Sequence, residues 1–130
     1  MDILVLRRLL ARYQQAAMAL LALWIVFGLF VGGAQPVAVG LVHAPWDKLA
    51  HAGVFSVLSV ALGLASGLRG WRMILLAVGG TLLVGVLDEW HQVFLPGRQA
   101  GWDDLAADAV GSLLGATLLT VLYRSTKKTN

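Results

Sequence analysis

Residues 16–34 read AAMALLALWIVFGLFVGGA, an uninterrupted apolar run that contains no charged side chain. A transmembrane helix needs about 20 predominantly apolar residues, so this run predicts a membrane span. The run is longer than the apolar core of about 7–15 residues in a cleaved signal peptide, which favours a retained helix. Gly32, Gly33 and Pro36 mark its end.

The composition of the whole chain also indicates a membrane protein. Of its 130 residues, 58% are hydrophobic and only 13% are charged, whereas a soluble domain carries about 25% charged residues. The chain contains no cysteine, which excludes disulfide frameworks, thiol catalysis and cysteine-ligated zinc.

Three further apolar segments lie at about 49–68, 73–91 and 105–123. With residues 16–34 they predict an all-α fold, an integral membrane four-helix bundle in which residues 1–130 form a single domain. Residues 1–12 are basic and partly amphipathic, and they predict a helix on the membrane surface. Pairs of glycines four residues apart predict close helix contacts; these pairs are Gly28 and Gly32, Gly63 and Gly67, and Gly111 and Gly115.

The charged residues divide between the two ends of the predicted bundle. Basic groups lie at both termini and between the second and third spans: Arg7, Arg8, Arg12, Arg69, Arg72, Arg124, Lys127 and Lys128. Acidic residues occupy the other two connections: Asp47, Asp88, Glu89, Asp103, Asp104 and Asp108. The positive-inside rule therefore places both termini in the cytoplasm. Because apolar runs separate the basic groups, they form no continuous stripe for nucleic acid, and no nucleic-acid partner is expected.

Polar side chains gather at the acidic end, where three spans begin or end. Residues four apart share a helix face, as do Asp47 and His51, Asp88 and Gln92, and Asp104 and Asp108. A charge at the centre of a membrane helix costs roughly 2.5–3.5 kcal/mol on insertion scales, so ionisable groups there usually pair or face a wet cavity. We therefore expect the three helix ends to turn these residues toward one another in a polar extracytoplasmic site.

Several of these residues also have purely structural explanations. Asp47 and Asp103 suit helix N-caps, and Lys48 can extend its ammonium group to the interface. Asp104 is expected to be solvated, and His43 is expected in a loop. For the whole group, the alternative to a functional site is a polar network that only locks the helices together.

In their order along the chain, these motifs resemble the VanZ-like membrane protein family. The matching pieces are Asp47-Lys48-x-x-His51, Asp88-Glu89-x-His91-Gln92, Pro96-Gly97-Arg98 and Asp103-Asp104-x-x-x-Asp108-x-x-Gly111. They cover roughly residues 45–115. The four motifs in this order identify the family more specifically than any one of them alone. The family often has Asn at the position of Asp108. The resemblance implies a multi-pass protein of the bacterial plasma (inner) membrane and a link to glycopeptide resistance, especially to teicoplanin.

The first functional hypothesis is an enzyme that acts on a lipid or a lipid-linked cell-envelope substrate. His51 or His91 would be the general base or nucleophile, and Asp88 or Glu89 would orient the imidazole or act as the acid. The predicted substrate-binding residues are Lys48, Gln92, Arg98 and Asp108. Among them, the guanidinium group of Arg98 is suited to a phosphate.

A divalent metal is a variant of this hypothesis. The carboxylates of Asp88, Glu89 and Asp108 suit Mg²⁺ or Mn²⁺, and His51 and His91 would also admit Zn²⁺. The chain has no HExxH motif, so no compact metal-binding signature identifies an ion, and the cofactor stays open.

The second hypothesis is a non-catalytic membrane protein that binds a lipid headgroup or an amphiphilic antibiotic. The same residues would serve, but removing one charge would weaken binding rather than abolish turnover. A transporter or proton path is the third hypothesis; four short helices are few for transport unless the protein oligomerises, which the sequence leaves open. Membrane lipids or a lipid-linked envelope precursor are the expected partners.

Overall fold

A computed structural model describes the backbone of residues 2–128 and the side chains of residues 2–124. The elements, in order, are α1 (Ile3–Phe27), the π-helical turn η1 (Gly28–Gly32), the 3-10 turn η2 (Pro36–Ala38), α2 (Trp46–Ala65), α3 (Trp71–Gln92) and α4 (Trp102–Lys128). Residues 2–128 contain no strand, so the all-α prediction is confirmed. The side chains of Lys127 and Lys128, predicted to be part of a basic group, lie outside the described residues.

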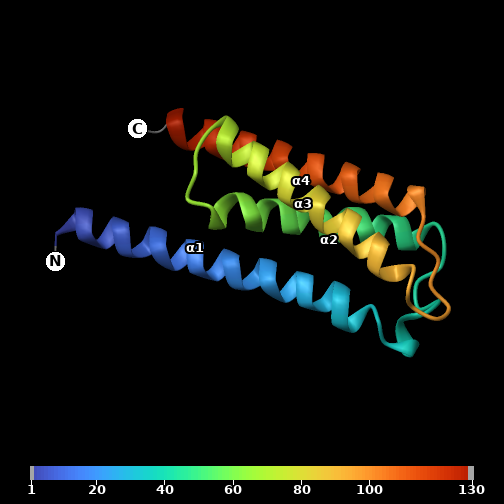
Figure 1. Cartoon of the computed structure of the whole chain (residues 1–130). Helices are drawn as coiled ribbons and strands as arrows, with labels where there is room; N and C mark the ends of the chain where they lie inside the picture. The colour runs from blue at the N-terminus through green and yellow to red at the C-terminus, as the bar shows by residue number, and fades with distance from the viewer. Residues whose placement is uncertain (1, 129–130) are drawn as a thin grey trace.

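Four helical segments of the described chain are long and apolar enough to cross a membrane. They run up and down, so that both ends of the chain and the connection between α2 and α3 lie at one end of the bundle (Figure 1). The predicted ranges 49–68, 73–91 and 105–123 each begin a little after the helix that contains most of their residues. These helices begin at Trp46, Trp71 and Trp102, residues that suit the headgroup layer of a bilayer.

The predicted surface helix at residues 1–12 is wrong as a separate element. Asp2 accepts a hydrogen bond at 3.0 Å from the backbone N–H of Leu4 and caps the helix N-terminus, a common role of aspartate. From Ile3 the backbone then continues as one helix to Phe27. Residues 3–12 contain no glycine or proline that would end the helix, so the basic segment extends the first span.

Close packing of α2 against α4 fixes the acidic end of the bundle. Phe55 and Leu58 of α2 are fully buried, and Ser59 donates a hydrogen bond at 3.0 Å to the backbone oxygen of Ser112. A Cβ atom built on Gly111 would lie 2.3 Å from the backbone oxygen of Ala52, so only glycine allows this approach. This contact agrees with the close packing predicted for the pair Gly111 and Gly115.

The other predicted glycine pairs behave differently. Cβ atoms built on Gly28 and Gly32 would meet nothing within 4 Å. Gly63 contacts Leu119 of α4, whereas Gly67 lies beyond α2 at a positive φ of 64°. A Cβ atom on Gly67 would lie 2.6 Å from the side chain of Gln15 in α1, so the Gly-x-x-x-Gly spacing identifies close contacts at two of the three pairs and none at Gly28 and Gly32.

The first span is the least buried of the four. It contacts α2, where Ala22 packs on Leu58 and Ala61. Elsewhere its large apolar side chains are open, as at Leu20 and Trp24. In a bilayer such side chains contact lipid, so α1 shields one side of the bundle, and its continuation η1 reaches the acidic end, where Phe30 lies beside His91 (Figure 1).

Candidate functional site

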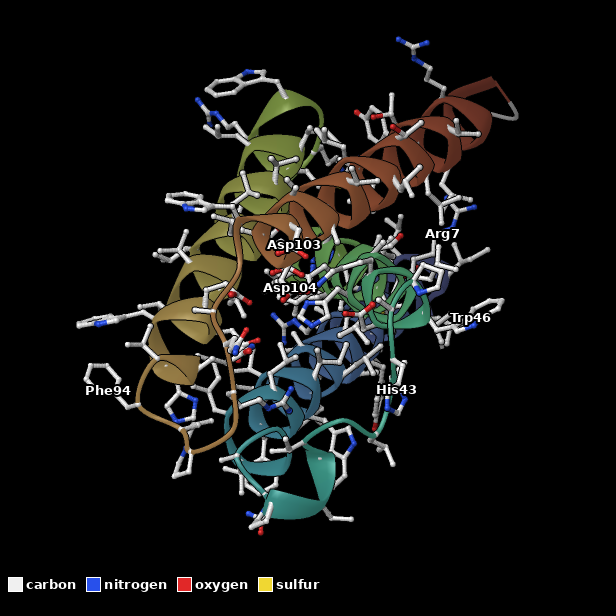
Figure 2. All side chains as sticks on the ribbon, turned by 90° about the vertical axis from the view of Figure 1, so that its right-hand side faces the viewer. Arg7, His43, Trp46, Phe94, Asp103 and Asp104 are labelled. Carbon is white, nitrogen blue, oxygen red and sulfur yellow. The ribbon has the colours of Figure 1, made fainter. Side chains whose placement is uncertain are left out.

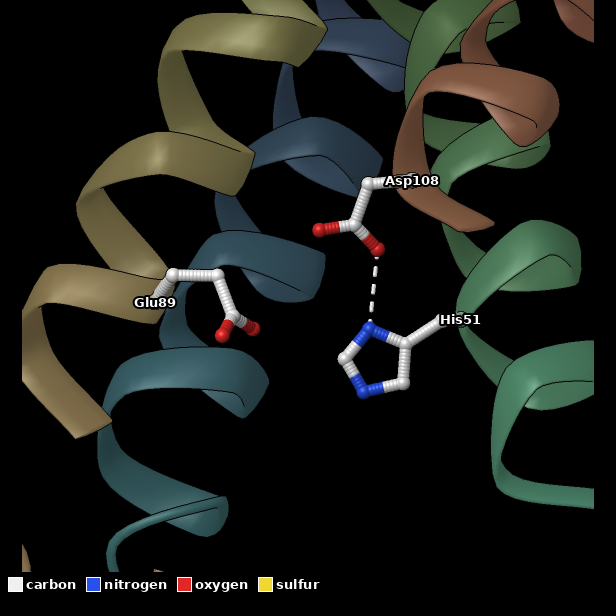
Figure 3. Close-up of side chains that lie close together, drawn as sticks. All are labelled: His51, Glu89 and Asp108. Atoms are coloured by element: carbon white, nitrogen blue, oxygen red, sulfur yellow. Dashed lines mark hydrogen bonds and ion pairs between the residues drawn. The ribbon is translucent and has the colours of Figure 1, made fainter. Parts of the chain in front are cut away.

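His51, Glu89 and Asp108, which we call the polar centre, lie together between the ends of three helices. The Nδ1 atom of His51 is 2.8 Å from Oδ1 of Asp108, a hydrogen-bond distance. One nitrogen or oxygen atom from each of the three side chains lies within 4.8 Å of the others. Figure 3 shows the carboxylate of Glu89 reaching from α3 toward the imidazole and the carboxylate of Asp108. The sequence predicts this meeting of helix ends, but the carboxylate that contacts the imidazole belongs to Asp108, predicted to bind substrate, and not to Asp88 or Glu89.

Small residues allow the polar centre to form. Gly111 lies three residues after Asp108 on the same face of α4, and its contact with Ala52 draws α4 against α2 beside His51. On α3, a Cβ atom built on Gly85 would lie 3.0 Å from Oδ2 of Asp108. The absence of a side chain at Gly85 therefore leaves the space that this carboxylate occupies.

Hydrogen bonds orient the carboxylates at the end of α3. The backbone N–H of Gly101 donates to Oε2 of Glu89 at 2.8 Å. The amide of Gln92 donates to Asp88 at 3.1 Å and to Glu89 at 3.4 Å. Gln92, predicted to bind substrate, thus also links the two acidic residues, and the loop before α4 fixes the carboxylate of Glu89 from the other side.

Lys48 forms an ionic clamp between α2 and α4. Its ammonium group pairs with Asp47 at 3.0 Å, with Asp103 at 2.9 Å and, at a still shorter distance, with Asp104. Figure 2 shows Asp103 and Asp104 near the middle of this end of the bundle, with His43 in the loop toward its edge. Lys48 was predicted to bind substrate; its ammonium group lies among three carboxylates, and the predicted role stays a prediction.

The expectation that Asp104 is solvated is wrong. Its side chain is only 14% exposed, and Oδ1 lies 3.9 Å from Nε2 of His51. Asp103 lies inside the first turn of α4, which begins at Trp102, so it is not the residue that precedes the helix. The four-residue spacing between Asp104 and Asp108 was the available signal, because it places Asp104 on the face that carries the polar centre.

A polar pocket of about 450 Å³ opens beside the polar centre. His51 and Asp104 line one side, Gln92 and Arg98 line another, and the loop at residues 38–42 covers it. No sequence motif predicts this part of the pocket, because its residues are apolar or glycine: Ala38, Val39, Gly40, Leu41 and Val42.

Arg98 connects this pocket to the first span. It donates a hydrogen bond at 2.8 Å to the backbone oxygen of Gly33. Its Nε atom is buried and has no hydrogen-bond partner. Because Arg98 lines the pocket, its guanidinium group can bind an anionic group there.

His91 lies apart from the polar centre. Its ring lies 5.2 Å, centroid to centroid, from the ring of Phe30 in η1. Its Nδ1 atom is buried without a hydrogen-bond partner, and it does not line the polar pocket. The structure therefore brings His51, and not His91, into the centre, although the two histidines were equal candidates by sequence.

Buried negative charge is the main electrostatic feature of the site. The residues Asp88, Glu89 and Asp108 are 3%, 8% and 0% exposed. Among the described side chains, no lysine or arginine pairs with any of these three, since Lys48 pairs with other carboxylates. Burying three carboxylates without a lysine or arginine partner is costly, because the charged form loses its hydration.

Replacing Lys48 by methionine is expected to lower the stability of the bundle by about 1–2 kcal/mol. The change leaves Asp47, Asp103 and Asp104 without their shared cation. Because these side chains are partly exposed to solvent, the decrease in the free energy of unfolding is limited. Thermal unfolding in detergent measures the effect. The matched control is Arg72→Met, which removes a cation that lies over the ring of Trp71. Equal unfolding temperatures for the two variants would contradict the clamp.

Four membrane-length helices around a buried ionisable centre define a multi-pass membrane protein with a polar site at one end of its bundle. The family model described as VanZ/LLP1 matches residues 5–123, almost the whole chain, and the protein belongs to this family. The family predicted from the ordered motifs is thereby confirmed. No curated protein and no solved structure gives a significant match.

Proposed function

We propose that this protein is a membrane enzyme that acts on a lipid or a lipid-linked cell-envelope substrate at the polar centre. The observation that carries the proposal is the 2.8 Å hydrogen bond between His51 and the fully buried Asp108, beside a pocket that also contains Arg98. A buried carboxylate that orients an imidazole is a recurrent arrangement for proton transfer in catalysis.

His51 is the proposed proton acceptor. Its Nδ1 atom faces Asp108, so Nε2 is the nitrogen left to take a proton from water or from a substrate hydroxyl. The oxygen that loses this proton attacks an ester or phosphoester centre, and the bond to the leaving oxygen breaks. Glu89, in its protonated form, returns a proton to that leaving oxygen, which balances the transfer.

Arg98 is the proposed headgroup ligand. Its position in the pocket and the fork of its guanidinium group suit a phosphate or carboxylate. The same observation supports the second candidate function, a protein that binds a lipid headgroup or an amphiphilic antibiotic without turnover. Either activity at the envelope face would alter access to lipid-linked precursors, which is how we connect the site to glycopeptide resistance.

Mass spectrometry of lipids tests the proposed reaction. Wild type and Glu89→Gln are expressed in one host at equal abundance, and total lipids and lipid-linked envelope precursors are compared. We expect at least one species to be consumed or produced only with wild type. Identical profiles from two folded proteins would reject the enzyme and leave the binding function, in which loss of one charge weakens capture of the ligand.

We further propose that the polar centre faces outward from the bacterial plasma membrane. The basic residues Arg69 and Arg72 lie at the same end of the bundle as both ends of the chain, and the positive-inside rule assigns that end to the cytoplasm. Because the chain contains no cysteine, Arg69→Cys and Gln99→Cys each supply a unique thiol. An impermeant thiol reagent is expected to label Gln99→Cys on intact cells and Arg69→Cys only after lysis; the reverse pattern would overturn this orientation.

A further inference from the structure

We propose that the polar centre is a binding site for one divalent cation, held by His51, Glu89 and Asp108. The inference deepens the proposed function and rests on it for the use of the ion, whereas binding of the ion can be measured without turnover.

The three side chains offer the ligand atoms that such an ion needs. One atom from each lies within 4.8 Å of the others, and ligand distances of about 2.0–2.2 Å in a tetrahedral site require these atoms to move about 1 Å closer together. One imidazole and two carboxylates suit Zn²⁺ or Mn²⁺, which accept mixed nitrogen and oxygen ligands. Three protein ligands also leave coordination positions open to water or substrate, as catalytic sites do.

An unsatisfied atom points to a missing ligand. Asp108 is 0% exposed, and its Oδ2 atom has no hydrogen-bond partner. In Figure 3 this second oxygen points away from His51, toward the side of the centre from which Glu89 comes. A buried carboxylate oxygen without a partner costs about 1–3 kcal/mol or more, because it has lost its hydration. A cation bound in the centre would satisfy it.

Charge balance favours the same conclusion. Asp88, Glu89 and Asp108 are all buried, and none of them pairs with a lysine or arginine among the described side chains. The cation of Lys48 is shared among three other carboxylates, and Arg98 donates to the backbone of Gly33. Apart from His51, which is positive only when protonated, no cationic side chain among the described residues pairs with these carboxylates, and a divalent ion would neutralise the charge of two of them.

The bound ion would also serve the proposed reaction. The imidazole nitrogen and carboxylate oxygen that share a proton in the metal-free chain would both become ligands. The proton would then be lost from a water bound to the ion, since a catalytic zinc ion lowers the pKa of its water to about 7. With the ion bound, Glu89 would be an ionised ligand and not the proton donor, so the leaving oxygen would take up the proton that the bound water loses. Asn in place of Asp108 would keep one oxygen ligand.

Metal binding to the full-length protein in detergent tests the inference. After removal of metals with a chelator, the protein is dialysed against Zn²⁺, Mn²⁺ or Mg²⁺ separately, and bound metal is measured by mass spectrometry and titration calorimetry. We expect one Zn²⁺ or Mn²⁺ per chain. Glu89→Gln and His51→Ala are expected to weaken binding by at least about 100-fold, since even partners outside the ligand set change metal affinity about 10–100-fold.

Two controls separate the site from surface binding and from misfolding. His43→Ala removes a histidine of the loop, and Asp103→Asn removes a carboxylate whose side chain is 71% exposed; both should bind metal as wild type does. The ion should raise the unfolding temperature of wild type and of these controls, but not that of Glu89→Gln. A wild type that binds no ion, or binding that Glu89→Gln leaves unchanged, would overturn the inference.

The inference and the proposed function can fail separately. Lipid turnover by chelator-treated protein without bound metal would keep the enzyme and reject the use of the ion in its reaction, whereas the binding measurement decides the site itself. One bound ion in a protein that changes no lipid would keep the metal site and reject the enzyme.

Discussion

His51→Gln is expected to lower turnover of the lipid substrate by about 10²–10⁴-fold while the bundle stays folded. Glutamine matches the imidazole roughly in size and can still hydrogen-bond to Asp108, so packing between α2 and α4 is retained. It cannot accept a proton near neutral pH, however, and it provides no imidazole nitrogen for a metal. The loss should therefore appear in the catalytic rate, measured with whichever lipid distinguishes wild type from Glu89→Gln.

The two remaining histidines provide matched controls for this variant. His43 lies in the loop (Figure 2), and the ring of His91 lies beside Phe30. His43→Gln and His91→Gln are each expected to retain turnover within about threefold of wild type, because neither removes a member of the polar centre. Loss of activity in His91→Gln with full activity in His51→Gln would assign the reaction to the other histidine and contradict our placement of the base.

The sequence predicted the membrane spans because their signal is local. An apolar run near 20 residues has few structural solutions in a bilayer, where each backbone polar group must be satisfied within its own helix. The same constraint placed the ionisable residues of three helix ends together, since a lone charge at that depth is costly. This reasoning put His51, Glu89 and Asp108 in one cluster with Asp88 and His91, but it did not single out these three residues.

Other features of the site depend on contacts between distant segments. Gly101 orients Glu89, and Arg98 reaches the backbone of Gly33. No local sequence pattern predicts either contact. The prediction that Asp104 is solvated is wrong for a related reason: its burial results from pairing with Lys48 on another helix. His51 and His91 could not be separated by sequence, because the direction of each ring depends on how α2 and α3 rotate against their neighbours.

Gly111→Val is expected to be the most disruptive single change in the bundle. A Cβ atom at this position would lie 2.3 Å from the backbone oxygen of Ala52, and backbone in the middle of a helix cannot move aside. The two helices must separate, which overpacking studies value at about 1–3 kcal/mol and occasionally more. Separation also draws Asp108, three residues earlier on the same face, away from His51.

Thermal unfolding in detergent and metal binding measure the two consequences of Gly111→Val. The matched control is Gly79→Val, at a glycine inside α3 where an added Cβ meets nothing within 4 Å. We expect Gly79→Val to unfold near the wild-type temperature and to keep the ion, whereas Gly111→Val loses both stability and metal. Equal unfolding of the two variants would mean that α2 and α4 do not meet at this contact. The hydrogen bond between His51 and Asp108 would then lack its structural basis, because the same helix approach creates both.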